Sequence, residues 1–426
     1  MLHADHAKFR GNFDVNWPMF TIDQIKDKSP RSCVGGPFGS DLTTRDYTED
    51  GVPVIRGNNL STDGYFHDSE FVFVSVEKAS SLSANAAFPG DLVFTQRGTL
   101  GQVALIPEQS IHRKYVISQS QMKLTVNREI VLPEFVYWWF RQPNVIEMVR
   151  RRAITSGVPH INLGILKSFE LKIPSLEVQK KIVKTVRELS ALVENNRRRI
   201  FLLEESARLL YREWFVHLRF PGHKHVKVVD GVPEGWGRTF MPDLIGINPT
   251  ERIDRAKEAW YVPMAALSET GMIVDRGDFE LRTSHTAVKF RNGDVLLARI
   301  TPCLENGKTA FVYFLDEDEV ACGSTEFIVL RGLKVSPYFV YCLSRTYDFR
   351  EHAIKSMIGS SGRQRVQTSC FSEYLVPLPP GSLLRDFDCA VGPVFEQIVV
   401  LQRENEKLSE ARGLLLPRLM SGEIQV

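Results

Sequence analysis

The chain has 426 residues, which is enough for two or three domains. Hydrophobic residues make up 43% and charged residues 24% of it, as in ordinary globular proteins, and no apolar run reaches the roughly 18 residues that a membrane-spanning helix needs. The formal net charge of +2 excludes a generally basic coat for nucleic acid but allows local basic faces.

The first residues, MLHADHAKFRGNF, contain no apolar stretch, so we expect no signal peptide. The 6 cysteines form no C-x-x-C pair and have no regular spacing. In a chain of this length they predict the reduced thiols of a cytoplasmic protein, and neither a disulfide framework nor a metal site.

Short β-branched segments bounded by glycine and proline predict strands in the first part of the chain. They are GVPVIRG, FVFVSV, DLVFTQRG and GQVALIP. An aromatic-rich helix is predicted at 132–143, and we expect its aromatic side chains to lie in the core. We therefore predict a mixed α/β (α+β) domain over residues 1–175.

A long helix is predicted next, within residues 176–222. Its apolar residues recur at alternating spacings of four and three, the pattern of a coiled-coil seam, and from 182 to 214 it would extend roughly 48 Å. The seam positions are Ile182, Val186, Leu189, Val193, Asn196, Ile200, Leu203, Ala207, Leu210 and Trp214. A second apolar set outside the seam predicts either domain packing or a surface for a partner protein: Leu192, Phe201, Leu202, Leu209 and Phe215.

Residues 223–380 repeat the pattern of the first domain. AWYVPM, DVLLARI, TAFVYFL and EFIVLRG predict strands, and 336–347 predicts a second aromatic-rich helix. Ser156-Gly157 recurs as Ser361-Gly362, and Ile173-Pro174 recurs as Leu378-Pro379, both 205 residues later. We infer an internal duplication, with a second mixed α/β domain at 223–380.

The seam also recurs, within residues 381–426, at Phe387, Val391, Val394, Ile398, Leu401, Asn405, Leu408, Arg412, Leu415 and Leu419. Gly392-Pro393 predicts either a kink or a helix that begins at Pro393, and Gly413 and Pro417 predict a frayed end.

The direction of the two helices follows from the order of the chain. The first helix must carry the chain from one domain to the other, and antiparallel packing of the second helix brings the C-terminus back, with a pseudo-twofold relation between the copies. Full overlap then places residue x opposite residue 601 − x, so Asn196 faces Asn405, and this buried pair would fix the register. The alternative is that each helix packs only on its own domain.

Two polar, glycine-containing loops stand at equivalent points of the copies. Arginines 150–152 precede ITSGVPHIN (154–162), and Lys355 precedes SSGRQRVQT (360–368). Such loops can approach DNA phosphates and read bases, whereas the alternative for each arginine alone is a solvated surface residue. The candidate DNA-binding residues are Arg97, Arg152, Ser156, Gly157, His160, Asn162, Arg299, Ser361, Gly362, Arg363, Gln364 and Arg365.

Signals for catalysis are absent from the sequence. No G-x-G-x-x-G follows a predicted strand, and neither H-E-x-x-H nor G-x-S-x-G occurs. We therefore expect no enzyme activity, cofactor or metal in this chain.

Several segments together resemble one family over essentially the whole chain. IPSLEVQKKIV, LLYREWFVHLRFPGH, VPEGWG, LLLPRLMSGEI, GPFGSDLTTRDY and ARITPCLENGKTA are similar to segments of the specificity (S) subunits of Type I restriction–modification enzymes. The second copy departs from the family by having PPGSLLRDF where a glutamine is usual, as Gln179 is in the first copy.

The resemblance implies a non-catalytic reader of double-stranded DNA. Each target-recognition domain would read one half of a bipartite site, and the helices would set the spacing and bind two modification (M) subunits that methylate adenine. Restriction (R) subunits would add translocation and cleavage. The alternatives are a coiled-coil adaptor that binds only proteins, the specificity subunit of a related methyltransferase-only system, and a stand-alone methyltransferase, against which the missing motifs argue.

Overall fold

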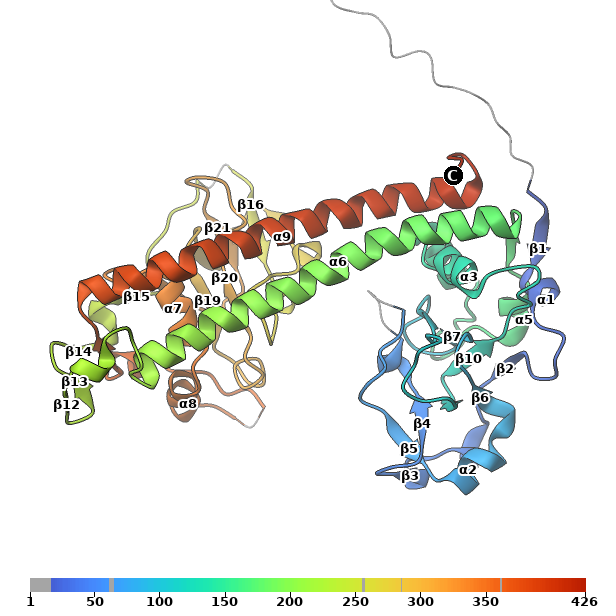
Figure 1. The fold of residues 1–426 in the computed structure, drawn as a ribbon, viewed down its shortest axis with the longest axis horizontal. Coiled ribbons are helices and arrows are strands. Elements are labelled where there is room, and N and C mark those ends of the chain that lie inside the picture. Colours follow the sequence, from blue (N-terminus) through green and yellow to red (C-terminus); the bar gives the residue numbers. More distant parts are fainter. Residues whose placement is uncertain (1–16, 61–64, 255–256, 285, 361) are drawn as a thin grey trace, which may run out of the picture. The chain divides into compact units, whose positions relative to one another are not determined.

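We describe a computed structural model of the protein, which covers residues 17–60, 65–254, 257–284, 286–360 and 362–426. The chain divides into two compact units. Unit 1 consists of the described residues up to Val193 together with Lys407–Val426, and unit 2 is Glu194–Glu406. The two long helices, α6 (Leu176–Tyr211) and α9 (Gly381–Ser421), each contribute a segment to both units (Figure 1).

The globular part of unit 1 is built on two sheets. One has the strand order β2-β10-β7-β8, and the other has the order β3-β5-β4-β9-β6, in which β4 and β9 are parallel. A two-stranded ribbon of β1 and β11 completes it. The strands are β1 (Met19–Thr21), β2 (Cys33–Gly35), β3 (Tyr47–Thr48), β4 (Val52–Ile55), β5 (Val72–Val74), β6 (Ala86–Ala87), β7 (Leu92–Thr95), β8 (Val103–Leu105), β9 (Tyr115–Ile117), β10 (Gln121–Leu124) and β11 (Glu170–Lys172).

Five short helices accompany these strands among the described residues of unit 1. The predicted aromatic helix is α3, and its side chains Tyr137, Trp138 and Trp139 are buried, which confirms that they belong to the core. The helices are α1 (Ile22–Ile25), α2 (Val76–Ser81), α3 (Pro133–Phe140), α4 (Pro143–Arg151) and α5 (Leu163–Lys167).

Unit 2 repeats this topology. Its sheets have the orders β15-β22-β19-β20 and β17-β16-β21-β18, with β16 and β21 parallel, and β14 pairs with β23 as β1 does with β11. The strands are β12 (Val228–Val229), β13 (Val232–Pro233), β14 (Gly237–Phe240), β15 (Ile245–Ile247), β16 (Ala259–Val262), β17 (Glu280–Arg282), β18 (Val288–Phe290), β19 (Val295–Ala298), β20 (Thr309–Phe311), β21 (Ala321–Gly323), β22 (Phe327–Gly332) and β23 (Leu375–Leu378).

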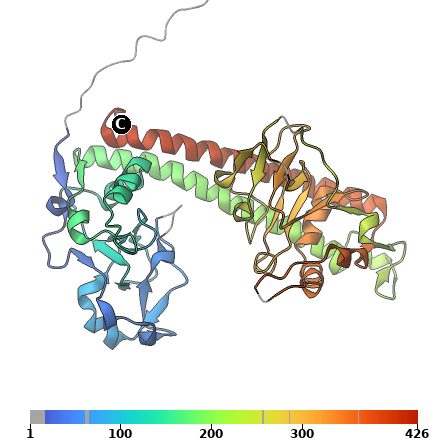
Figure 2. The same cartoon turned by 180° about the vertical axis from the view of Figure 1, so that it is seen from behind.

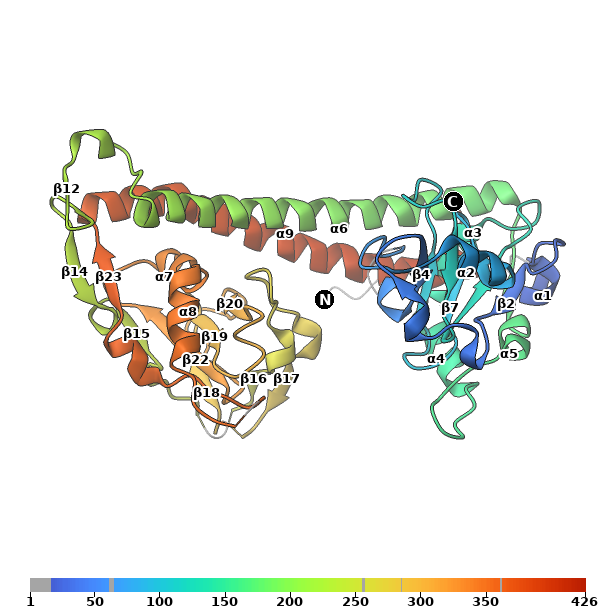
Figure 3. The same cartoon turned by 90° about the horizontal axis from the view of Figure 1, so that it is seen from below.

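The helices α7 (Pro337–Ser344) and α8 (Tyr347–Lys355) follow β22, as α3 and α4 follow β10. Helix α7 lies on the side of the sheet that faces the long helices (Figure 3). Its Tyr341 is fully buried, in one core with α6 and α9 residues. The repeated strand order and helix positions are what the internal duplication predicts.

Within each unit the two long helices pack both on each other and on the globular core. In unit 1, Ile182 and Val186 of α6 share a core with Leu416 and Leu419 of α9. The start of α6 lies beside the end of α9 in both views (Figures 1 and 2). In unit 2, α6 residues from Ile200 to Tyr211 share a core with α9 residues from Phe387 to Leu401. The segments run antiparallel, because early residues of α6 meet late residues of α9 and the reverse.

The expectations that helix α9 begins at Pro393 and that it frays near Gly413 and Pro417 are wrong, whereas the alternative of a kink at Gly392-Pro393 stays a prediction. The helix is continuous through Gly392, Pro393, Gly413 and Pro417 and ends only at Ser421. A proline inside a helix costs about 3 kcal/mol. Burial of the neighbouring Val391, Phe395 and Ile398 offsets this cost, since each fully buried side chain of this kind contributes about 1.5–3 kcal/mol. Pro393 itself is on the exposed side.

For Phe215, a member of the apolar set outside the seam, the structure confirms domain packing, one of the two predicted alternatives. Helix α6 continues into a π-helical turn, Arg212–Val216. This turn rotates the side chain of Phe215 into the core. Its ring lies 5.0 Å from that of Phe387 and 5.2 Å from that of Phe339. The other members of that set, Leu192, Phe201, Leu202 and Leu209, are exposed.

The glutamine that only the first copy contains has a structural role. The buried side chain of Gln179 accepts a hydrogen bond from the Leu132 backbone N–H at 2.8 Å. Its amide nitrogen donates to the carbonyls of Ile130 and Pro174, at 3.0 and 2.9 Å. It therefore ties the start of α6 to the segment that begins α3.

None of the helices in the described part of the chain has the length and apolar character that a membrane crossing requires.

Candidate nucleic-acid interface

Each unit carries one of the two predicted loops as a short hairpin. In unit 1, backbone hydrogen bonds join Ile154 and His160 in both directions, at 2.8 and 3.1 Å. In unit 2 they join Ile358 and Arg365, both at 3.0 Å. Both loops follow the second of two consecutive helices, α4 or α8, so the duplication places them at the same point of the fold.

A second bridge holds each loop to the end of a central strand. His160 bridges to Arg97 after β7, and Arg365 bridges to Ile300 after β19. His160 and Arg365 are therefore equivalent, as are Arg97 and Ile300. Arg299, which the sequence placed in the region matching Arg97, lies one residue earlier, and side chains alternate along an extended strand. The two arginines thus do not occupy one position.

The tips of both loops are exposed and each contains a glycine in the left-handed region. The φ angles are +84° at Gly157 and +79° at Gly362, which other residues adopt only with strain. Ser156 is exposed beside Gly157. Its predicted counterpart Ser361 lies outside the described residues. A backbone of this kind can approach a phosphate closely, because a glycine presents no side chain.

A cleft of about 900 Å³ opens beside the loop of unit 1. The cleft is lined by predicted DNA-binding residues from distant parts of the sequence. Polar residues at the ends of neighbouring strands also line it. Its lining includes Gln96, Arg97, Gln119, His160, Asn162 and the glycine-rich turn 35–39.

Two of the predicted residues of unit 1 have roles within the protein. The Asn162 side chain caps α5, because its oxygen accepts a hydrogen bond from the Ile165 N–H at 2.8 Å. Arg152 is exposed, but its guanidinium lies 4.8 Å from the centroid of the Phe169 ring, and it does not line the cleft. Arg97 and His160 are thus the predicted unit 1 side chains that the cleft presents most directly.

In unit 2 the predicted residues divide by exposure. Arg299 is half-buried and donates from Nη2 to the Val366 carbonyl at 2.8 Å, so it fixes the base of the loop. The backbone of Gln364 is fixed on both sides by Thr301, whose N–H donates to its carbonyl at 3.1 Å and whose hydroxyl accepts from its N–H at 3.1 Å. Arg363 is exposed.

Arg365 is held by an acidic residue that sequence reasoning missed. Its Nε donates to both carboxylate oxygens of Glu326 at 2.9 Å, and its Nη2 donates to Oε1 at 2.6 Å. The Glu326 carboxylate raises the pKa of the guanidinium. Glu326 directly precedes β22 and is 39 residues away in sequence, so no local pattern marks it.

The glycine-rich turn of unit 1 adds a further missed residue, Phe38, whose side chain is 87% exposed. Gln119 holds this turn by donating from its amide to the carbonyls of Gly39 and Leu42, the latter at 2.8 Å. The segment GPFGSD was quoted above for its family resemblance, and that resemblance was the available signal.

Comparisons with known proteins agree with this geometry. A family model described as "Type I restriction modification DNA specificity domain" matches residues 17–205. The MjaIX specificity subunit of a Type I restriction enzyme from Methanocaldococcus jannaschii is 24% identical to the chain over 98% of the chain and 95% of its own length.

The chain is similar to Type I specificity subunits over almost its whole length.

Other similar proteins cover less of the chain. The HindI specificity subunit of Haemophilus influenzae is 25% identical over 73% of the chain and 81% of its own length. A crystal structure of a Type I restriction–modification S subunit from M. genitalium covers 97% of the chain and 98% of its own, with a TM-score of 0.55 and 16% identity. At this identity the likeness supports the fold.

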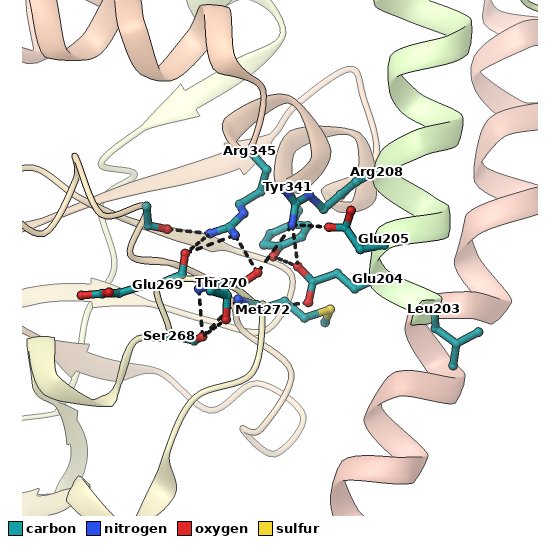
Figure 4. Close-up of polar contacts among 12 residues, drawn as sticks. Leu203, Glu204, Glu205, Arg208, Ser268, Glu269, Thr270, Met272, Tyr341 and Arg345 are labelled. Atoms are coloured by element: carbon teal, nitrogen blue, oxygen red, sulfur yellow. Dashed lines mark hydrogen bonds and ion pairs between the residues drawn. The ribbon is translucent and has the colours of Figure 1, made fainter. Parts of the chain in front are cut away.

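A buried polar network joins α6 to the second globular domain within unit 2 (Figure 4). The Glu204 carboxylate accepts hydrogen bonds from the Tyr341 hydroxyl, at 2.5 Å, and from the Met272 N–H, at 2.8 Å. Burial raises the pKa of Glu204. Arg345 donates to the carbonyls of Gly307 and Thr270, at 2.5 and 2.8 Å. Through Glu204 the network links α6 both to α7 and to the loop that contains Met272.

The two seam asparagines also lie in unit 2, and both are buried. The Asn196 amide nitrogen donates a hydrogen bond to Oε2 of Glu404 at 3.1 Å. Glu404 is the residue directly before Asn405 in the sequence. The amide atoms of Asn405 have no hydrogen-bond partner among the described residues. The ring of Trp214 lies 6.1 Å from that of Phe387, its partner in the predicted register. The two amides thus form no hydrogen bond with each other, and the placement of the two asparagines opposite each other in the register stays a prediction.

Proposed function

We propose that this chain is the non-catalytic DNA-reading subunit of a Type I restriction–modification complex. Each globular domain would read one half of a bipartite, asymmetric site on double-stranded DNA. The observation that carries the proposal is the pair of equivalent hairpin loops, which share a backbone frame but present His160 in one copy and Arg365 in the other. A shared frame with different side chains suits two half-sites of different sequence.

The proposed division of the chain follows the sequence. Residues 1–175 and 223–380 would form the two target-recognition domains, and 176–222 and 381–426 would form the spacer between them. The proposed DNA contacts are the candidate residues named above, with Arg97, His160, Arg363 and Arg365 foremost. Half-sites that lie on one face of DNA, one helical turn apart, are separated by about 34 Å. A helix of roughly 48 Å is long enough to hold two domains at a separation of this size.

The catalytic steps would belong to partner subunits. Two modification subunits would bind the spacer helices and methylate adenine, and restriction subunits would add translocation and cleavage, in the cytoplasm where the DNA lies. Phe201, Leu202 and Leu209 of α6 support a protein partner, because all three large apolar side chains are about half exposed or more.

The test is a map of methylated adenines in the source genome, compared with the map after deletion of this chain. We expect one bipartite motif, with two specified halves and a fixed spacer, to lose its methylation on deletion. Re-expression of the chain should restore the same motif. A map that does not change on deletion would contradict the proposal, and would leave the coiled-coil adaptor as the better explanation.

A further inference from the structure

The pair of Arg365 and Glu326 has a geometry that a plain phosphate contact does not need. The Nε–H and one Nη2–H of the guanidinium point to Glu326. An arginine has five N–H donors, so the second Nη2–H and the two Nη1–H remain. Of these, only a long contact of 3.5 Å, from Nη1 to the Arg363 carbonyl, is formed within the described residues.

The remaining donors lie along one edge of the guanidinium, between Nη1 and Nη2. This edge matches the O6 and N7 acceptors of guanine in the major groove, which arginine contacts with two parallel hydrogen bonds. The side chain of Arg365 is 43% exposed, and its hydrogen bonds to Glu326 use the Nε and Nη2 side. Thus the carboxylate occupies one side of the guanidinium and leaves the guanine-reading side available.

The charge of the pair also argues for a base contact. Glu326 brings a negative charge to within hydrogen-bonding distance of Arg365, and the pair as a whole is neutral. A neutral pair gains little from the phosphates, whose attraction for cations provides most sequence-independent affinity. A fixed orientation is what the carboxylate supplies, and orientation matters for base reading. Arg363, by contrast, forms no ion pair with any carboxylate that the structure describes.

The backbone under the pair is also fixed. Arg365 is bridged on one side to Ile300 and on the other to Ile358. The Glu326 carbonyl accepts a hydrogen bond from the Arg299 N–H at 2.9 Å, and the Glu326 N–H donates to the Ser324 hydroxyl at 3.2 Å. Both partners therefore hold their positions before DNA arrives.

We propose that Arg365 reads a guanine in the half-site of the second domain, and that Glu326 is the residue that positions it. This inference rests on the proposed function and deepens it. In unit 1 the equivalent of Arg365 is His160. The equivalent of Glu326 is Ser120, whose carbonyl accepts hydrogen bonds from the backbone N–H groups that follow β7, as the Glu326 carbonyl does after β19. The reading chemistry at this position therefore differs between the two half-sites.

The experiment uses the complete complex with its modification subunits and a library of duplex DNA. The first half-site is kept fixed, and the second half-site is randomised. Methylated molecules are sequenced for the wild type and for Arg365→Ala, Arg365→Lys, Glu326→Gln and Glu326→Ala. The wild type should require guanine at one position, and each variant should lower that preference about 5- to 150-fold while leaving the other positions unchanged.

A matched control is the pair of Arg282 and Glu280 on β17. It has the same side-on contact, with Nε and Nη2 at 2.9 and 2.7 Å from Oε2, and the arginine side chain is 41% exposed. The substitution Arg282→Ala should leave the preferred sequence unchanged.

Guanine preference retained in Arg365→Ala, or in both Glu326 variants, would overturn the inference and leave the proposed function intact. An equal loss of preference at all positions would also overturn it, because it would indicate a structural role. A wild-type complex that methylates without any sequence preference would contradict the proposed function and the inference together.

Discussion

The Tyr341 hydroxyl donates a hydrogen bond to the Glu204 carboxylate, which joins the second globular domain to α6 inside a shared core. The backbone N–H of Met272 donates to the other carboxylate oxygen. Arg208 is 3.7 Å from Glu204 but directs its closer contact, 2.8 Å, to Glu205. The buried carboxylate is thus held mainly by two neutral donors, and its charge is only partly compensated.

This arrangement predicts a pH-dependent stability. Burial raises the pKa of Glu204 above its usual value of 4.5, so the folded state binds this proton more tightly than the unfolded state. Its contribution to stability is therefore fully present below pH 4.5 and is lost as the pH rises through the raised pKa. Relative to Glu204→Gln, the wild type should become less stable over that rise.

The measurement is chemical unfolding of the wild type and of Glu204→Gln at several pH values. Glu204→Ala should be destabilised by about 1–3 kcal/mol at every pH, because it leaves Tyr341 and Met272 without their acceptor. Glu205→Gln is the control, since its partner pair is more exposed, and it should show no such trend. A constant difference between wild type and Glu204→Gln would contradict the expected titration.

Asn405 supplies a second prediction. Its side chain is 5% exposed, and neither amide atom is hydrogen-bonded to a described residue. A buried polar group without a partner costs about 1–3 kcal/mol, so Asn405→Leu should raise the free energy of unfolding by that order. Asn196→Leu, which removes the bond to Glu404, should gain less. Denaturant unfolding checks this, and a loss of stability in Asn405→Leu would show that the amide is satisfied in solution.

The fold could be predicted from the sequence to a large extent because its main signals are periodic. The seam pattern needs only apolar residues at the right spacing, and it located α6 and α9. The sequence pattern did not predict the course of a helix where the local preference of a residue and its packing favour different conformations. Gly392 and Pro393 favour a break, but the burial of Val391 and Phe395 keeps the helix continuous. The pattern also could not choose between domain packing and a partner surface for Phe215, because a π-helical turn follows α6 there.

The candidate site could be predicted only in part. Both loops were found because glycine and basic residues lie close together in the sequence. The role of each side chain could not be predicted, because it depends on partner residues that the register of the strands brings close. Glu326 lies 39 residues before Arg365, and the orientation of Arg299 depends on a carbonyl 67 residues away. The sequence alone contains no signal for either pairing.

A third prediction concerns the buried ion pair of unit 2. Arg331 donates from Nε and Nη2 to the two carboxylate oxygens of Asp294, both at 2.6 Å, and it also contacts Glu251. The Asp294 side chain is 1% exposed. Arg331→Ala leaves this carboxylate buried without its cation, which costs about 3–5 kcal/mol.

Thermal or denaturant unfolding of the Arg331→Ala variant tests this. The control is Arg151→Ala, which removes an exposed pair with Glu147 and should change stability by less than about 0.5 kcal/mol. Equal effects of the two substitutions would show that Asp294 is not isolated from water.

The last prediction separates affinity from sequence reading. Arg363 is exposed at the loop tip beside Gly362, where the backbone can approach a phosphate. Because Arg363 has no carboxylate partner among the described residues, it should release about one counterion on binding. Arg363→Ala should therefore weaken binding to all duplexes alike and reduce the slope of log affinity against log salt by about one. Titrations of the complex at several salt concentrations measure this, with Arg282→Ala as the control. A changed base preference with an unchanged salt slope would instead show that Arg363 contacts a base.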